Sequence, residues 1–309
     1  MTATVSDPPH SGSKGSGSKG LPIAGALLAA VSWAIAFPLV TIALTVMSPL
    51  PLSSIRFVSA GILALVWIVW KRAPFPAPRH LVRYLACGLF GSACYSGFIN
   101  IGQATVSAGA ASFITNIIPI LTAIIAWFAL GERLNWAGWL GCLIGFAGVS
   151  YIAMDQPGGL SFGAGAMFVF LASLGASIYF VLQKPLIETY GAVPCTAYTL
   201  VFSGLVLLLW FPQAVREVGG ASPRQFLAVL GLILFPTLLA YAGQVYALGR
   251  LPAGVMTSVL YLTGPMATLL AFVVLGDVPS PATLIGGALA IFGTVVVARW
   301  GKAASPGAA

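Results

Sequence analysis

The sequence predicts an all-α integral membrane protein in which ten transmembrane helices form two inverted five-helix repeats around a central cavity. Of the 309 residues, 59% are hydrophobic and only 6% are charged, and the mean hydropathy is +1.00. A soluble domain carries about 25% charged residues, so this chain has too few charges to cover a surface that faces water. Composition therefore excludes a soluble enzyme and a disordered chain. The apolar stretches and an internal repeat predict the rest.

Ten apolar stretches predict the membrane spans. Each has about 18–27 residues, which is the length that an α-helix needs to cross a bilayer. Uninterrupted apolar runs of this length favour helices over barrel strands. The stretches cover residues 22–46, 52–70, 81–103, 104–130, 135–153, 162–183, 195–213, 226–248, 252–275 and 281–300.

Lysine and arginine are divided unevenly between the two sides of the predicted membrane. When loops are assigned to alternate sides, the side with both termini holds eleven of these residues, and the opposite side holds only Arg216 and Arg224. Because cytoplasmic loops carry the excess of basic residues, we expect both termini to be cytoplasmic. Residues 1–20, rich in Ser, Gly and Lys, are expected to form a flexible tail, and residues 302–309 a second tail.

The chain repeats itself. An offset of 146 residues aligns Tyr95 with Tyr241 and Pro119 with Pro265. Each half holds five spans, so the odd number makes the second half enter the membrane upside down. Inverted repeats of this kind are typical of secondary transporters, which bind substrate near the midplane between the halves. We expect residues 21–155 and 156–301 to be the two repeats of one membrane domain.

Several short motifs resemble those of a known family. They are Ala-Gly-Ala-Ala-Ser at 108–112, Pro-Ile-Leu-Thr at 119–122, Leu-Gly-Glu-Arg at 130–133, Arg-Phe at 56–57 and Pro-Ala-Gly at 252–254. With the Gly-rich fifth span, they resemble the EamA module of the drug/metabolite transporter (DMT) superfamily, present here as two tandem modules. Within that superfamily the chain is most similar to the YddG-type bacterial amino-acid exporters. The second half departs from the pattern, because Asp277-Val-Pro replaces Glu132-Arg.

The resemblance implies a multi-pass secondary transporter of the bacterial cell inner membrane that works by alternating access. It implies export of small neutral or amphipathic metabolites, with amino acids, aromatic ones included, as the leading substrates. An exporter of hydrophobic drugs is the first alternative. A nucleotide-sugar or phosphate-ester antiporter ranks lower, because phosphate groups call for several cationic residues in the cavity. An integral membrane enzyme or a channel ranks lower still, because the spans hold no catalytic constellation and no charged pore rings.

Polar residues follow helical spacing on the third, fourth, eighth and ninth spans, which the repeat pairs with one another. Polar side chains inside a membrane are costly unless they face protein or water. We therefore expect one set of them to face the substrate pathway: Tyr95, Asn100, Asn116, Tyr241, Gln244 and Tyr261. Hydrogen bonding between helices is the alternative for each of them.

One tryptophan and four prolines stand out within the spans. Trp33 lies near the middle of the first span with Phe37 one turn on, so the two rings could form an aromatic wall for an amphipathic substrate. A tryptophan in the core or facing lipid is the alternative. Proline removes a helical donor and can kink a helix, and the residues expected to do so are Pro38, Pro119, Pro236 and Pro265.

The fifth and tenth spans each carry a face of small residues. These are Gly138, Gly141, Gly145 and Gly148 in one and Gly286, Ala290 and Gly293 in the other. Such faces allow two helices to approach closely. Since both halves carry one, packing within a single chain and a monomer are favoured, and a homodimer is the alternative.

Charged groups are rare within the spans. No carboxylate or histidine falls at mid-membrane, so we expect no obligate proton coupling through a buried acid. No cluster suggests a metal or another cofactor, and the basic residues lie in loops and tails, so no nucleic-acid partner is expected. The expected partners are a small-molecule substrate and membrane lipid. Arg56 is the one charge well inside a span, where it could snorkel to the surface, cap carbonyls or attract a substrate carboxylate.

Overall fold

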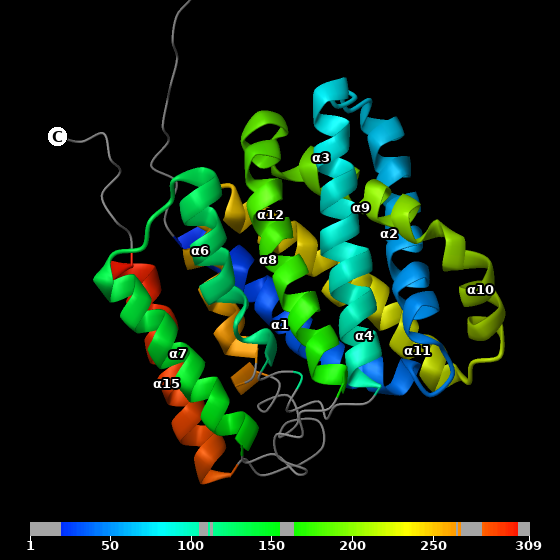
Figure 1. Ribbon diagram of the computed structural model, residues 1–309. Helices are drawn as coiled ribbons and strands as arrows, with labels where there is room; N and C mark the ends of the chain where they lie inside the picture. The colour runs from blue at the N-terminus through cyan, green and yellow to red at the C-terminus, as the bar shows by residue number, and fades with distance from the viewer. Residues whose placement is uncertain are drawn as a thin grey trace, which may run out of the picture.

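The computed structural model describes residues 20–104, 111, 114–154, 164–263, 265–266 and 280–301. Within these ranges the protein is all-helical (Figure 1). The predicted tails lie outside them except for Gly20, which begins the first helix rather than ending a tail. Most of the motif at 108–112, Asp277 and the boundary between residues 155 and 156 also lie outside them. The division into two repeats at that boundary therefore stays a prediction.

The first half contains five described apolar segments. The first two are single helices, and the third is built from two α-helices with a π-helical stretch between them. The elements are α1 (Gly20–Ala43), α2 (Pro49–Lys71), α3 (Pro78–Gly88), η1 (Leu89–Gly97), α4 (Phe98–Gln103), α6 (Ile118–Leu130) and α7 (Trp136–Met154).

The second half follows the same order. Its elements are α8 (Ala164–Tyr190), α9 (Ala192–Leu207), η2 (Leu208–Trp210), α10 (Phe211–Gly219), α11 (Pro223–Leu232), η3 (Ile233–Leu239), α12 (Ala240–Leu248), α13 (Ala253–Ser258), η4 (Val259–Leu262) and α15 (Pro281–Trp300). The seventh span, expected at 195–213, instead ends in a short 3₁₀ turn that leads into α10. Pro212 occupies the first turn of α10, and the polar residues Gln213, Arg216 and Glu217 follow it.

The described helices are long and apolar enough for a membrane protein. Six of them reach the length and hydropathy of a membrane span, and four shorter apolar helices accompany them, at Ile118–Leu130, Trp136–Tyr151, Ala253–Leu262 and Leu284–Trp300. Large apolar side chains cover their outer faces, among them Trp70, Phe128 and Trp136, which are all more than 70% exposed. Such a surface suits contact with lipid.

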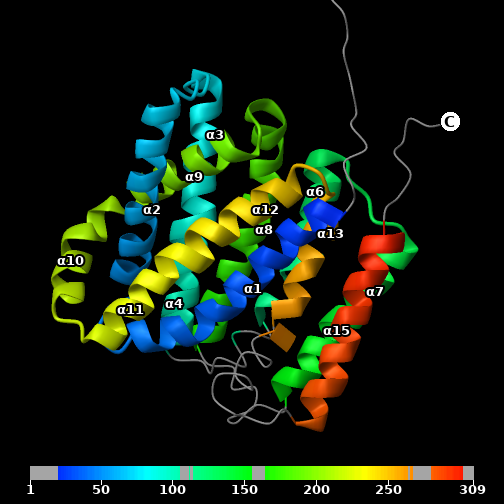
Figure 2. The same cartoon turned by 180° about the vertical axis from the view of Figure 1, so that it is seen from behind.

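Helices of the two halves pack in pairs that follow the repeat. The pairs are α2 with α9, α6 with α13 and α7 with α15. In addition α1 packs against α12, and its repeat counterpart α8 packs against η1 and α4. Exchange of the halves thus maps the first three contacts onto themselves and the α1–α12 contact onto the contact of α8 with η1 and α4. The α7–α15 pair forms one side of the molecule in both views (Figure 1, Figure 2).

Small residues bring these pairs together. A Cβ atom on Gly141 of α7 would lie 2.8 Å from the Gly293 carbonyl oxygen of α15. One on Gly61 of α2 would lie 2.9 Å from the Leu200 carbonyl oxygen of α9. The small faces of the fifth and tenth spans therefore meet within one chain, where any larger side chain would push the two backbones apart.

The four prolines occupy different kinds of position. Pro38 lies inside α1, which continues to Ala43. Pro119 lies in the first turn of α6, where proline is well tolerated, so the helix begins there rather than kinking. Pro236 lies inside η3. Pro265 follows η4 and approaches Gly287 of α15.

Candidate functional site

A cavity lies where the two halves meet, and both contribute to its wall. Among the residues predicted to face the pathway, it is lined by Trp33, Tyr95, Asn100, Asn116 and Tyr241. The wall runs from the middle of the helices to Gln103, where α4 ends. The structure thus brings together residues from α1, η1, α4, α12 and the segment before α6.

Aromatic rings form much of this wall. The Trp33 indole Nε1 donates a hydrogen bond of 3.2 Å to the Pro236 carbonyl, which ties α1 to η3. Trp33 meets Phe180 edge to face, with ring centroids 6.4 Å apart. The Tyr241 ring packs against Tyr179, with centroids 5.9 Å apart, and against Phe57, with centroids 5.8 Å apart. The Phe37 side chain lies outside the described part of the chain, so its expected place in the wall stays a prediction.

Two π-helical segments border the cavity at related positions of the two halves. Tyr95 lies in η1, and the offset of 146 residues carries η1 onto a stretch that overlaps η3. Gly91 of η1 and Pro236 of η3 both line the cavity. The Tyr241 hydroxyl donates a bond of 3.0 Å to the Gly91 carbonyl, which joins the halves across the site. Single-turn π segments in helices are frequent at functional sites.

A buried polar network extends from Tyr179 of the cavity wall to α9. The Tyr179 hydroxyl donates to Gln244 Oε1 at 3.4 Å, and Gln244 Nε2 donates to Gln183 Oε1 at 2.8 Å. Gln183 in turn donates to Thr199 Oγ1 on α9 at 3.2 Å. Gln244 was expected to face the pathway, but the structure places it in this network rather than on the cavity wall.

The next residue of α8 forms an ion pair between the halves. Lys184 Nζ pairs with Glu132 and also donates to the Leu251 carbonyl at 3.1 Å. The second carboxylate oxygen of Glu132 accepts a bond of 2.8 Å from the Ala253 amide, at the beginning of α13. Gly131, with φ of 68°, ends α6 in the left-handed conformation, and Glu132 follows it beside Lys184 and the beginning of α13. The sequence motifs at 130–133 and 252–254 are therefore in contact, through the bond between Glu132 and Ala253.

Tyr261 lies outside the cavity, although its sequence position suggested the pathway. The side chain is fully buried beside Val149 and Ala290. Its ring occupies the space that a Cβ on Gly145 of α7 would need. The structure therefore places Tyr261 in helix packing next to the α7–α15 contact.

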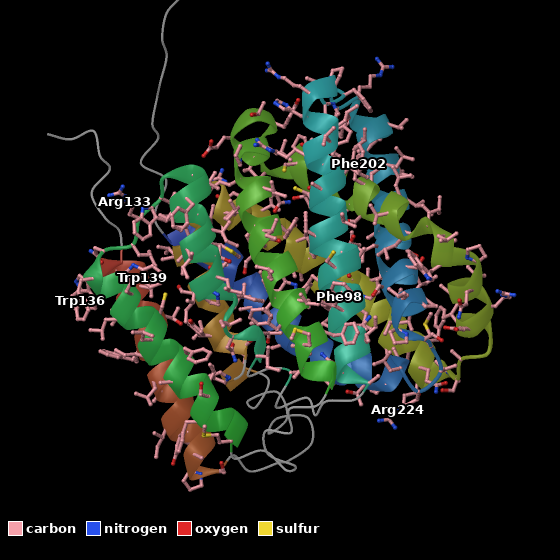
Figure 3. The ribbon with its side chains drawn as sticks, in the orientation of Figure 1. Phe98, Arg133, Trp136, Trp139, Phe202 and Arg224 are labelled. Carbon is pink, nitrogen blue, oxygen red and sulfur yellow. The ribbon has the colours of Figure 1, made fainter. Side chains whose placement is uncertain are left out.

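Charged and aromatic side chains distinguish the two ends of the molecule. Arg133 and Trp136 lie at the end where α7 begins, and Arg224 lies at the opposite end (Figure 3). The α7 end also holds the end of α15, because the Asn135 amide donates to the Gly301 carbonyl at 3.2 Å. Arg133 lies over the Trp127 ring at 5.6 Å. A belt of tryptophan with basic residues is typical of a membrane interface.

Residues 20–154 and 163–299 each match the model of the EamA-like transporter family. The chain belongs to this family. It contains two EamA modules of the drug/metabolite transporter type. The protein is therefore a multi-pass membrane transporter and not an enzyme.

Curated relatives of this EamA protein are transporters as well. A probable terminal-alkyne amino-acid exporter of Streptantibioticus cattleyicolor is 30% identical over 273 residues, which cover 88% of this chain and 92% of the relative. The uncharacterized transporter YdfC of Bacillus subtilis is 29% identical, over 84% of this chain and 85% of the relative. The uncharacterized inner membrane transporter YedA of Escherichia coli is 25% identical, over 90% of both chains.

The fold has a close match among solved structures. One crystal structure superimposes with a TM-score of 0.73 and covers 91% of this chain and 97% of its own. The sequences are 21% identical, so the comparison supports the EamA fold alone.

The cavity also contains residues that the sequence did not single out for the pathway. Tyr179, Phe180 and Phe57 line it. The offset that relates Tyr95 to Tyr241 also relates Trp33 to Tyr179, so applying the repeat to the first span would have found this ring.

Arg56 also lines the cavity, and its side chain is 7% exposed. Its Nε donates a bond of 3.3 Å to Thr237 Oγ1. The interpretation that Arg56 snorkels to the membrane surface is therefore wrong. It points into the protein because Thr237 of η3 offers it an acceptor there.

Proposed function

We propose that this EamA protein is an inner-membrane secondary transporter that exports small neutral or amphipathic metabolites, with amino acids, aromatic ones included, as its substrates. One observation carries the proposal: the cavity between the two halves combines aromatic rings with a few polar groups. Ligand sites typically have this composition, a mostly apolar wall with a small number of placed polar groups. Trp33, Phe180 and Tyr241 provide flat apolar surfaces for a side chain.

The choice of amino acids over other metabolites rests on the polar groups and on one relative. Arg56 is the one cationic residue among those that line the cavity in the described part of the chain. A sugar phosphate or nucleotide would call for several cations, whereas an amino acid has one carboxylate. The relative named as a probable amino-acid exporter supports both the substrate class and the direction.

We further propose ten spans, five in each module, with the modules in opposite orientations. The paired contacts α2–α9, α6–α13 and α7–α15 support a twofold relation between the modules. The uneven distribution of Lys and Arg supports cytoplasmic termini. In that orientation the Glu132–Lys184 pair closes the cytoplasmic end, and the cavity belongs to an outward-facing state of an alternating-access cycle.

Transport should proceed without obligate proton coupling. Among the described residues that line the cavity, none is a carboxylate or a histidine. The carboxylate of Glu132 is engaged by Lys184 and Ala253. Proton-coupled carriers usually keep a titratable group within the membrane, so a carrier with this lining should equilibrate its substrate down the substrate's own gradient.

Uptake into liposomes that contain only the purified protein tests this function. The assay uses a panel of labelled amino acids, without a pH or ion gradient, and empty liposomes as the control. Saturable uptake of at least one amino acid is the expected result. Uptake that requires an imposed proton gradient would overturn the uncoupled mechanism. No uptake of any amino acid, with uptake of a hydrophobic cationic dye instead, would favour a drug exporter.

A further inference from the structure

The Arg56 guanidinium has hydrogen-bonding capacity that the described residues leave unused. Its Nε donates to Thr237 Oγ1, and the Thr237 hydroxyl donates to the Leu232 carbonyl at 2.7 Å. A carbonyl oxygen can only accept, so the Thr237 hydroxyl is a donor toward Leu232 and an acceptor toward Arg56. These bonds hold the guanidinium in place by one nitrogen. Its two terminal nitrogens have no hydrogen-bond acceptor among the described residues.

No acidic partner neutralises this cation in the described part of the chain. Among those residues, the one ion pair joins Lys184 to Glu132. The Glu217 carboxylate accepts bonds from Ser48, outside the cavity. A buried cation without a counter-ion is costly, and a guanidinium suits a carboxylate because its donors match both oxygens. An anionic group of the substrate would satisfy Arg56.

Asn100, on the same cavity wall, has an acceptor oxygen without a hydrogen-bond donor, whereas Arg56 has donor nitrogens without an acceptor. Its Nδ2 donates to the Pro49 carbonyl at 3.1 Å and to Ser53 Oγ at 3.0 Å. A carbonyl oxygen can only accept, which fixes the nitrogen of the amide on that side and turns Oδ1 away from it. Asn100 is fully buried, and its Oδ1 has no donor among the described residues. A buried acceptor without a donor is rare in native proteins.

The two groups lie beside the same stretch of α2. Ser53, which holds Asn100, precedes Arg56 by three residues, and residues at this spacing are neighbours on one helix face. Asn100 and Arg56 both line the cavity. Among the described residues, the wall thus presents an acceptor without a donor and a cation without a carboxylate partner beside the same stretch of α2. A ligand whose ammonium and carboxylate groups are bonded to one carbon atom would supply both.

We infer that Arg56 and Asn100 form a zwitterion clamp, which makes a free α-amino acid the substrate class. The Arg56 guanidinium binds the carboxylate, and Asn100 Oδ1 accepts a hydrogen bond from the ammonium group. The aromatic wall is then left for the side chain. This inference rests on the proposed function and adds to it that both charged ends of the substrate are recognised.

Competition among three matched molecules tests the clamp. Uptake of tritiated L-phenylalanine into proteoliposomes is measured against unlabelled L-phenylalanine, phenethylamine, which lacks the carboxylate, and hydrocinnamate, which lacks the ammonium group. We expect L-phenylalanine to compete at least about tenfold better than either analogue, since hydrogen bonds to charged groups are the stronger ones. If another amino acid of the panel is carried instead, its own amine and acid analogues take their place.

Substitutions then assign each end of the substrate to one residue. Arg56→Gln should weaken competition by L-phenylalanine and hydrocinnamate about tenfold and leave phenethylamine unchanged. Asn100→Leu should weaken L-phenylalanine and phenethylamine and leave hydrocinnamate unchanged. Arg56→Lys, which keeps the charge, should retain part of the carboxylate preference. Arg224→Gln, the same change at an exposed arginine at the end of the molecule opposite Arg133 (Figure 3), is the control.

Each outcome has a distinct meaning. A purely structural role of Arg56 or Asn100 predicts equal weakening of all three competitors, and that result would overturn the clamp while the proposed function stands. Equal competition by all three molecules in the unmodified protein would overturn it as well, with no variant needed. No uptake of any amino acid would overturn the proposed function, and the clamp with it.

Discussion

Lys184 and Glu132 form an ion pair that joins the two EamA modules, and the neighbouring residue Gln183 bonds Gln244. The pair is partly buried, with 12% and 23% of the two side chains exposed. Each partner also bonds a backbone group, Lys184 at Leu251 in the loop before α13 and Glu132 at Ala253, the first residue of α13. The contact therefore fixes α6, α8 and α13 relative to one another.

Loss of this pair should destabilise the protein. Glu132→Gln removes the charge that pairs with Lys184 and leaves the ammonium poorly compensated, which costs about 1.5–3 kcal/mol for a hydrogen bond to a charged group. We expect a thermal midpoint several degrees lower in detergent, measured by intrinsic fluorescence. Glu188→Gln is the control, because Glu188 is an exposed glutamate on α8, the helix that carries Lys184. Equal midpoints for the two variants would show that the pair contributes no stability.

The glycine contact between α7 and α15 should not tolerate even one methyl group. Gly141→Ala places a Cβ 2.8 Å from the Gly293 carbonyl oxygen, and backbone cannot move aside cheaply. Overpacking of this kind costs about 1–3 kcal/mol. Gly219→Ala is the matched control, since a Cβ there meets nothing within 4 Å. Thermal midpoint and light scattering after size exclusion are the measurements. A stable Gly141→Ala protein with a changed oligomeric state would instead assign this face to a homodimer.

Two tyrosines expected in the pathway from the sequence, Tyr241 and Tyr261, should respond differently to loss of the hydroxyl. The Tyr261 hydroxyl is buried without a partner among the described residues, so Tyr261→Phe should leave transport unchanged and stability equal or slightly higher. Tyr241→Phe loses the 3.0 Å bond to Gly91 inside the cavity and should lower transport several-fold. Initial uptake rates of the two variants check this, and a transport loss in Tyr261→Phe would return Tyr261 to the pathway.

Much of this architecture could be predicted from the sequence. Apolar stretches of bilayer length located the helices, because in lipid nothing but a helix satisfies the backbone of such a run. The repeat predicted that Tyr95 and Tyr241 line one cavity, because repeat-related spans of the two halves both border the space between them. The small-residue faces around Gly141 and Gly293 also pack against each other, because they lie on repeat-related spans.

Other features depend on geometry that the sequence pattern does not contain. Tyr261 lies in the 3₁₀ segment η4, where three residues per turn rotate the face that a period of 3.6 predicts. Gln244 lies about one helical turn beyond Tyr241 of the cavity wall, where its amide donates a hydrogen bond to Gln183 of α8. The direction of Arg56 depends on Thr237, whose hydroxyl oxygen accepts from Arg56 while its own proton is donated to the Leu232 carbonyl.

The central claim is that the cavity between the two modules is the substrate pathway, and one pair of variants tests it most directly. Trp33→Ala removes a ring from the cavity wall together with its bond to Pro236. Trp136→Ala makes the same change on the outer face of α7, where the side chain is 78% exposed. Gradient-free uptake of the amino acid that the unmodified protein transports is measured for both, with the amount and thermal stability of the inserted protein matched.

The two variants should differ sharply. We predict that Trp33→Ala lowers saturable uptake at least about tenfold, as expected for loss of a large aromatic contact in a binding site. Trp136→Ala should transport at the rate of the unmodified protein. Unchanged uptake by Trp33→Ala, or equal losses in both variants, would contradict the assignment of this cavity as the pathway.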